Sequence, residues 1–155
     1  MILNDVLRSL RYLLDLADEH IIGTVHLADE SFPLEKAQVQ AYLKKDEEDG
    51  YLPCTDAMLA RFLDGLVIHY RGRQPDAAPR PFDKRVTNNI VLKKLRVAFE
   101  LKDTDLHQVF ADAGFPLSKP ELTALFRQPG HVNYRACGDQ VLRNFLKGLT
   151  RRIRG

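Results

Sequence analysis

The side chains that most often catalyse reactions or bind metal ions do not cluster in this 155-residue sequence. None of its five histidines has a cysteine at the spacing of metal ligands. The G-x-S-x-G motif of hydrolases, the phosphate-binding G-x-x-x-x-G-K loop and the dinucleotide-binding G-x-G-x-x-G motif are also missing. We therefore expect no metal, no cofactor and no enzymatic activity. A site assembled from residues distant in the sequence is the alternative.

The acidic run KDEEDG, at residues 45–50, is a second candidate for cation binding. It lacks the alternating oxygen ligands and the terminal glutamate of an EF-hand loop. We expect it to form a solvated, charged turn.

Charge is distributed unevenly along the chain. Residues 1–72 contain 7 Lys and Arg and 13 Asp and Glu, whereas residues 84–155 contain 14 and 6. The first segment therefore has a formal charge of −6 and the second of +8, and residues 73–83 contribute 2 of each sign. The net charge of +2 hides two halves of opposite sign.

Several basic residues of the second half share one helical stripe. Four of them, at i, i+4, i+8 and i+11, would lie opposite an apolar face: Arg143, Lys147, Arg151 and Arg154. Lys93 and Lys94 add to the basic half. Such a stripe can bind the phosphates of a nucleic acid by charge and counterion release. An acidic protein is another candidate partner, and so is a second copy of this chain. Solubility alone, or the helix dipole for the C-terminal RRIRG, is the explanation without a partner.

The two halves are copies of one unit. Residues 4–16 align with residues 89–101 at an offset of 85, and residues 32–72 align without a gap with residues 115–155 at an offset of 83. In the second alignment 15 of 41 positions are identical. The chain is therefore a tandem duplication, with an acidic repeat at residues 1–72, a proline-rich linker at 73–86 and a basic repeat at 87–155.

Apolar residues recur at helical spacing in both repeats, which predicts an all-α fold of two tandem four-helix repeats packed with pseudo-twofold symmetry. Asn4 and Asn89 are expected to cap the first helices. Ser118 and Glu121 form an S-x-x-E capping box at the start of a third helix. The other helices are expected at residues 18–29, 104–113, 56–70 and 139–153.

Gly65 and Gly148 fall inside the predicted fourth helices, where glycine costs about 1 kcal/mol relative to alanine. We expect close backbone approach there, either between the two fourth helices or against the first helix. A helix-turn-helix is a weaker possibility, with Lys119, Thr123, Arg127 and Gln128 projecting from a recognition helix. The turn before that helix is about two residues too long for the motif.

The two cysteines, Cys54 and Cys137, occupy the same position in each repeat, just before the fourth helix. With Thr55 or Gly138 as N-cap, they would sit at N′ and pack against a leucine at N4, as in a hydrophobic staple. Matched positions indicate matched packing roles. Redox or nucleophilic use is the alternative.

The paired motifs F-P-L, Y-x-x-C-x-D and F-L-x-G-L, followed by R-G at each end, resemble the YehS-like bacterial proteins, which carry a tandem domain of unknown function. The resemblance covers residues 4–155. It implies a small cytoplasmic bacterial protein with no established chemistry and carries over no functional residues. No apolar run approaches the ~20 residues of a membrane span, and charges interrupt the N-terminal segment, so no membrane segment is expected.

Together these features predict a non-enzymatic binding protein that contacts nucleic acid through its basic repeat. The alternative is an adaptor for protein partners, or a protein that self-associates through the opposite charges of its repeats.

Overall fold

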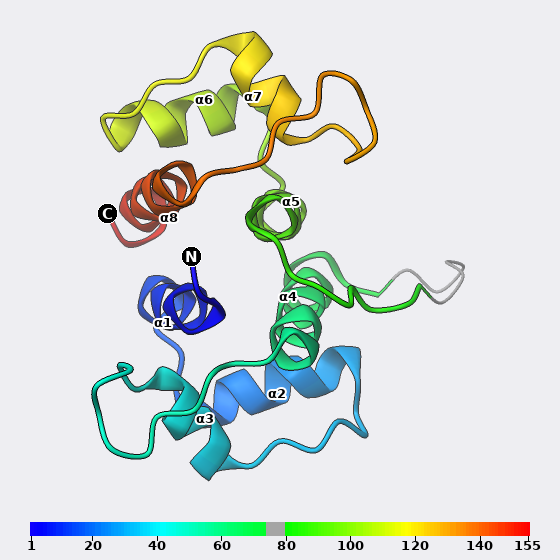
Figure 1. Cartoon of the computed structure of the whole chain (residues 1–155), viewed down its shortest axis with the longest axis vertical. Helices are drawn as coiled ribbons and strands as arrows, with labels where there is room; N and C mark the ends of the chain where they lie inside the picture. Colours follow the sequence, from blue (N-terminus) through cyan, green and yellow to red (C-terminus); the bar gives the residue numbers. More distant parts are fainter. Residues whose placement is uncertain (74–79) are drawn as a thin grey trace. The chain divides into compact units, whose positions relative to one another are not determined.

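The computed structural model describes residues 1–73 and 80–155, and within them every regular element is an α-helix, so the all-α prediction is confirmed (Figure 1). The first repeat contributes α1 (Leu3–Leu14), α2 (Asp18–Ala28), α3 (Lys36–Leu43) and α4 (Asp56–Arg71). The second contributes α5 (Asn88–Ala98), α6 (Asp103–Asp112), α7 (Lys119–Leu125) and α8 (Asp139–Arg154). By compactness, residues 2–86 form one unit and residues 87–155 another.

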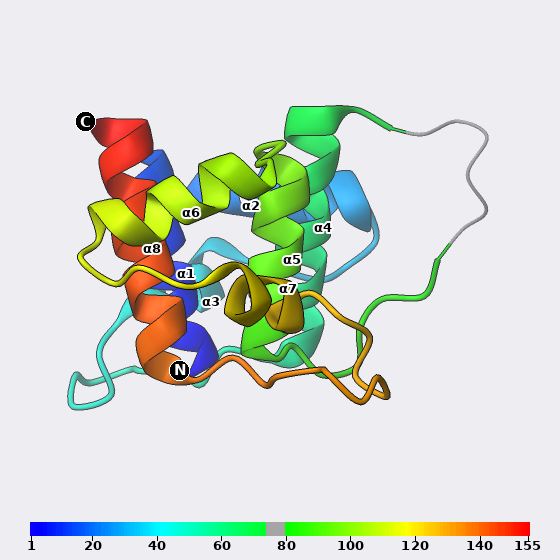
Figure 2. The same ribbon diagram turned by 90° about the horizontal axis from the view of Figure 1, so that it is seen from above.

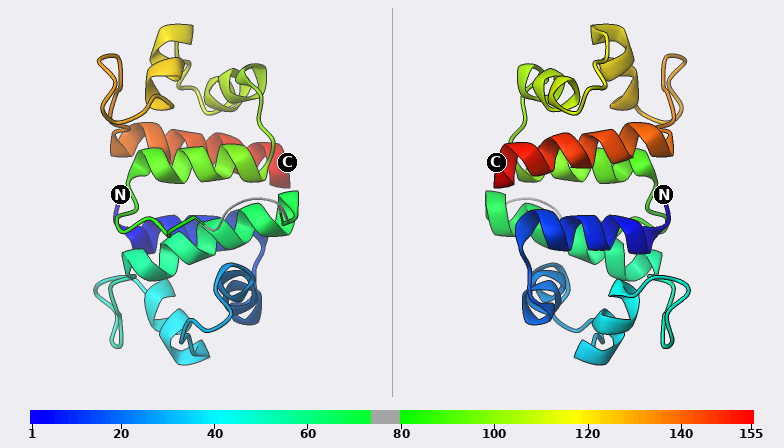
Figure 3. Two further views of the ribbon diagram at one scale, coloured as in Figure 1. Left: turned by 90° about the vertical axis from the view of Figure 1, so that its right-hand side faces the viewer. Right: turned by 90° about the vertical axis from the view of Figure 1, so that its left-hand side faces the viewer.

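The second and fourth helices of each repeat cross at very short distance. α2 packs on α4, and α6 packs on α8. Figure 3 shows α2 nearly end-on where α4 runs across the view, and Figure 2 shows α6 lying across α8. A Cβ atom added to Gly65 would overlap the backbone carbonyl of Thr24, and one added to Gly148 would overlap that of Val109. Glycine is required because the crossing helix occupies the space of a side chain.

The predicted close approach at these glycines is therefore confirmed, but the predicted partners are wrong. The fourth helix meets the second helix of its own repeat, and the contacted residues, Thr24 and Val109, are equivalent at the offset of 85. The physical reason is that the long apolar face of the fourth helix is covered by the second helix, whose backbone comes within contact of the glycine.

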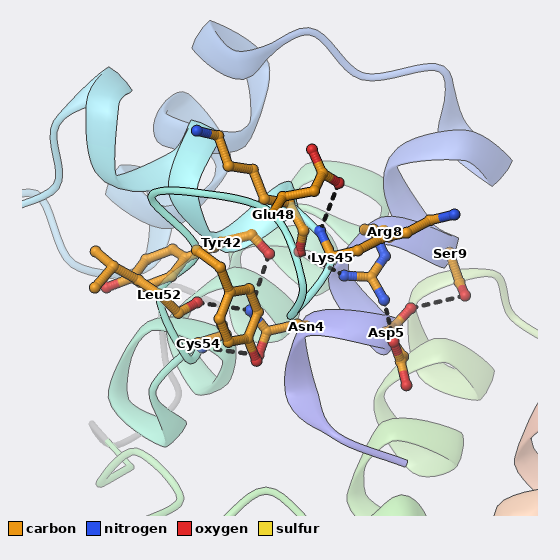
Figure 4. A network of polar contacts seen from close by, with 11 residues as sticks. Asn4, Asp5, Arg8, Ser9, Tyr42, Lys45, Glu48, Leu52 and Cys54 are labelled. Carbon is orange, nitrogen blue, oxygen red and sulfur yellow. Dashed lines mark hydrogen bonds and ion pairs between the residues drawn. The ribbon is translucent and has the colours of Figure 1, made fainter.

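A buried asparagine ties the start of the first helix to the segment before the fourth (Figure 4). Asn4 is only 2% exposed. Its Nδ2 donates to the carbonyl oxygens of Tyr42 (2.9 Å) and Leu52 (2.8 Å), and its Oδ1 accepts from the backbone N–H of Cys54 (2.9 Å) and the hydroxyl of Tyr51 (3.2 Å). One side chain thus satisfies four polar groups.

The second repeat reproduces this connection with the equivalent residues. Asn89 donates to the carbonyl oxygens of Leu125 and Arg135, both at 2.9 Å, and accepts from the backbone N–H of Cys137 at 2.8 Å. The predicted capping role of both asparagines is wrong, because α1 begins at Leu3 and α5 at Asn88. Thr87 caps α5 instead, by accepting from the N–H of Ile90 at 3.2 Å.

Other local predictions are confirmed. Ser118 accepts from the N–H of Glu121 at 3.2 Å, and the Glu121 carboxylate accepts from the N–H of Ser118 at 3.0 Å, which closes the capping box. Thr55 caps α4 by accepting from the N–H of Met58 at 3.1 Å. The acidic run forms an exposed turn, closed by a 2.7 Å bond from Lys44 Nζ to the carbonyl of Asp49.

The predicted linker falls partly on residues 74–79, which lie outside the described residues. Its described end, residues 80–86, is attached to the first repeat. The guanidinium carbon of Arg61 lies 4.2 Å from the ring centroid of Phe82 and 4.7 Å from that of Phe32. The N–H of Val86 donates to the Asp56 carboxylate at 2.8 Å. Among the described residues, no helix is both long and apolar enough to cross a bilayer.

We predict that G65A and G148A each destabilise the protein by about 2 kcal/mol or more, because the added methyl group must push the crossing helices apart. Chemical denaturation followed by circular dichroism measures this. Gly23 is the matched control, since it lies in α2 with nothing within 4 Å of an added Cβ. G23A should stabilise by up to about 1 kcal/mol. Equal effects at Gly23 and Gly65 would contradict the close crossing.

We also predict that N89A lowers the free energy of unfolding by about 2–4 kcal/mol, since it leaves two carbonyl oxygens and one N–H without their partner. N144A is the control, because among the described residues that side chain bonds to the carbonyl of Gln140 in its own helix and to no other group. N144A should change the stability by less than about 0.5 kcal/mol. A similar loss for both variants would exclude the proposed role of the buried amide.

Candidate nucleic-acid interface

α8 presents the basic stripe because its apolar residues fix the rotation of the helix. The buried residues of α8 lie on one side of the helix: Val141, Leu142, Phe145, Leu146, Gly148 and Leu149. The predicted stripe lies on the other side, and its four members are all exposed: Arg143, Lys147, Arg151 and Arg154. The first and last of them are separated by about 16 Å along the helix axis, at 1.5 Å per residue.

Two arginines near the end of α8 also have a structural role. Arg151 donates a hydrogen bond to the carbonyl oxygen of Asp112, at the C-terminus of α6. Arg152 of α8 forms an ion pair with Asp105 of α6 at 2.7 Å. Since a helix C-terminus carries partial negative charge, Arg151 stabilises α6 there. Arg151, which the sequence places in a phosphate-binding stripe, therefore also bonds within the protein.

The pair of Arg152 and Asp105 could have been found in the sequence. The equivalent residues of the first repeat are His69 and His20, so both positions change together between the repeats. Asp105 also accepts the N–H of Lys102 at 2.8 Å, which starts α6, and His20 Nδ1 accepts the N–H of Ala17 at 3.1 Å in the same way. That backbone bond, together with Arg152, holds the pKa of the Asp105 carboxyl below its usual range.

The other basic residues predicted to bind nucleic acid differ in their contacts within the protein. Lys94 and Arg154 each take part in an interaction. Lys93 is exposed on α5, which packs against α8, but no observed contact joins it to the α8 stripe. Arg143 and Lys147 are exposed, and no hydrogen bond or ion pair with another described residue holds either side chain. These two residues are the centre of the candidate interface.

The same surface of the first repeat has a different chemistry. Position 143 corresponds to Ala60, which is 2% exposed, and position 147 corresponds to Asp64. The difference in charge between the repeats is therefore located on this helix face as well as in the overall composition. The arrangement in the second repeat can attract anions by charge.

The two cysteines are buried and free. Burial raises the pKa of the Cys54 thiol to about 12 and that of Cys137 to about 11. Cys54 Sγ lies 3.7 Å from Met58 Sδ, in the first turn of α4. A thiol with so high a pKa is a poor nucleophile at neutral pH, so the surroundings favour packing. No three His, Cys, Asp or Glu side chains within the described ranges gather closely enough to hold a metal ion.

The α6–α7 segment does not have the geometry of a helix-turn-helix. Six residues, 113–118, separate the two helices, whereas the motif has a turn of 3–4 residues. α7 is only 7 residues long. Pro120 and Thr123 are exposed, although the motif needs buried apolar side chains there. The excess turn length noted in the sequence is thus present in the structure.

Comparison with known proteins agrees with the duplication. Residues 3–72 and 88–155 each match the family described as "Protein of unknown function (DUF1456)". The chain is 41% identical over 152 residues to the uncharacterized protein YehS of Escherichia coli (strain K12). The alignment covers 98% of this chain and 96% of that protein. No solved structure matches the chain. The two matched copies and the near-complete alignment together show that this protein belongs to the DUF1456 family.

Proposed function

We propose that the protein is a non-enzymatic binding protein whose second repeat contacts nucleic acid through the exposed face of α8. The observation that carries the proposal is the pair Arg143 and Lys147, which are exposed and which no hydrogen bond or salt bridge with a described residue holds, although Arg143 interacts electrostatically with Asp139 one turn earlier. Phosphate groups are the anions that such a row of cations fits best, because each contact releases condensed counterions.

The scaffold supports this use of the surface. The α8 backbone is fixed by the crossing with α6 at Gly148, and Arg151 holds the end of α6. The exposed cations therefore project from a rigid helix. The repeat of about 6 Å between Arg143 and Lys147 follows from four residues of helical rise. Nothing in this surface selects a base sequence, so we expect binding through the backbone.

We predict that R143E/K147E weakens the binding of labelled single- or double-stranded DNA or RNA at least about tenfold, measured by fluorescence anisotropy at about 50 mM and about 200 mM salt. The slope of log affinity against log salt concentration should fall by about 2, one for each lost phosphate contact. Thermal stability should stay nearly unchanged, since both side chains are exposed.

R11E/K45E is the matched control, because it makes the same change of charge at two exposed residues of the first repeat. It should alter the affinity far less than R143E/K147E does. If the unsubstituted protein binds none of the four nucleic acids at the lower salt concentration, the proposal is wrong. Equal losses for the two double variants would show a general effect of net charge.

The second candidate function is a protein adaptor that associates with itself. The opposite formal charges of residues 1–72 and residues 84–155, −6 and +8, favour head-to-tail contact between molecules. This contact would be electrostatic and weakened by salt.

For this second function we predict oligomers in sedimentation velocity at low salt, which dissociate as the salt concentration rises. R143E/K147E should shift the equilibrium toward the monomer, since it removes positive charge from one of the two faces. A monomer at every salt concentration would exclude self-association and leave nucleic-acid binding as the remaining proposal.

A further inference from the structure

A hollow of about 480 Å³ opens beside α7, and no residue of the α8 stripe is part of its lining. The residues of its lining that matter here come from α5, α6 and the segment after α7: Arg96, Asp103, Phe126, Arg127, Gln128 and His131. A second hollow, of about 580 Å³, shares Thr123 and Arg127 with the first and adds Lys119 and Asn133. The volume is in the range of sites that bind small molecules.

One cation of this hollow is held in place before any ligand arrives. Arg96 Nη2 pairs with the Asp103 carboxylate at 2.9 Å, and Nε donates to the carbonyl of Leu101 at 3.3 Å. Its guanidinium carbon lies 4.8 Å from the centroid of the Phe126 ring. Fixed donors lose less conformational entropy on binding, so they favour affinity. The pairing also neutralises Asp103, which is the acid in the lining.

The rest of the lining is rich in hydrogen-bond donors. His131 Nδ1 accepts the backbone N–H of Asn133 at 3.0 Å, so the proton of the neutral ring is on Nε2. Arg127 and Lys119 are exposed, and no hydrogen bond or ion pair with a described residue holds either side chain. The hollow thus has several donors, one neutralised acid and the uncompensated cation Arg127, and Lys119 lies in the adjoining hollow, so the surroundings favour an anion.

The first repeat provides an internal comparison. At the position of Thr123 it has Gln40, whose amide donates to Asp18 at 3.2 Å and bridges the equivalent space. At the position of His131 it has Glu48, and at the position of Arg127 it has Lys44, which bonds to the carbonyl of Asp49. Thr123 instead donates to Lys119 in its own helix at 2.9 Å. The basic residues have counterparts in the first repeat, since Arg96, Lys119 and Arg127 align with Arg11, Lys36 and Lys44. The repeats differ in that Lys36 is paired with Glu19 at 2.8 Å and in that Glu48 stands at the position of His131.

We propose that this hollow binds a phosphoryl group, with Arg96, Arg127 and His131 as its donors. The group would belong either to a nucleoside monophosphate or to a nucleic-acid strand. The inference stands on residues of α5 and of the segment after α7, and it does not depend on the stripe of α8.

The test is a ¹H–¹⁵N NMR titration of the whole protein at low salt with adenosine 5′-monophosphate, inorganic phosphate and adenosine as probes. The monophosphate and phosphate should produce saturable shifts of the backbone amides at Thr123, Arg127 and His131, and adenosine should not. R127E should weaken the monophosphate at least about tenfold, because it replaces a charge-assisted donor with an acid. R143E/K147E should leave this titration unchanged.

A short single-stranded RNA without terminal phosphates identifies the source of the phosphoryl group. If it shifts the same amides at lower concentration than the monophosphate, a strand is the ligand, and if it does not shift them, a free nucleotide is. The inference is overturned if none of the phosphate probes gives saturable shifts, or if adenosine gives the same ones. It also fails if residues 40–48 of the first repeat respond equally. RNA binding that R143E/K147E abolishes and R127E leaves intact would exclude a strand as the ligand of this hollow and leave the free nucleotide, while supporting the α8 interface.

Discussion

The buried amide of Asn4, repeated at Asn89, connects three parts of each repeat that are distant in the sequence. It joins the start of the first helix to the end of the third and to the extended segment before the fourth. In the first copy these contacts span 38 to 50 residues of sequence. Backbone groups that would be buried without partners become satisfied by a single side chain, which apolar residues could not do. The base of the loop after the third helix is thereby fixed in both repeats, whereas its tip is exposed and differs in sequence.

The crossing at Gly65 and Gly148 supplies the second constraint. Where two helix backbones touch, the fourth helix cannot rotate without bringing a side chain into the contact. The residues on its far side must then face away from the second helix. In α8 that side carries the exposed Arg143 and Lys147, and in α4 it carries Ala60, which is buried, and Asp64. A packing requirement that both copies keep thus determines where a charge difference can appear.

Periodicity and local motifs predicted the helices and the cap at Ser118, because these features depend on residues within four positions of one another. The role of Asn4 could not be found in this way, since its partners are backbone groups far along the chain. An asparagine near a helix start fits a cap equally well. Gly65 showed that a close approach exists but not which helix makes it. The pair of Arg152 and Asp105 was accessible, because comparing the repeats shows both positions changing together.

The duplication also explains why the two candidate surfaces cost the fold little. Arg143, Lys147 and Arg127 are exposed, so exchanging them for other residues removes no buried contact. The positions that hold the scaffold, the asparagine and the glycine, are the same in both copies. Substitution in one copy could therefore change the sign of a surface by several charges while the packing stayed the same. Part of the asymmetry of −6 against +8 lies at such exposed positions, whereas Arg151 and Arg152 also hold α6.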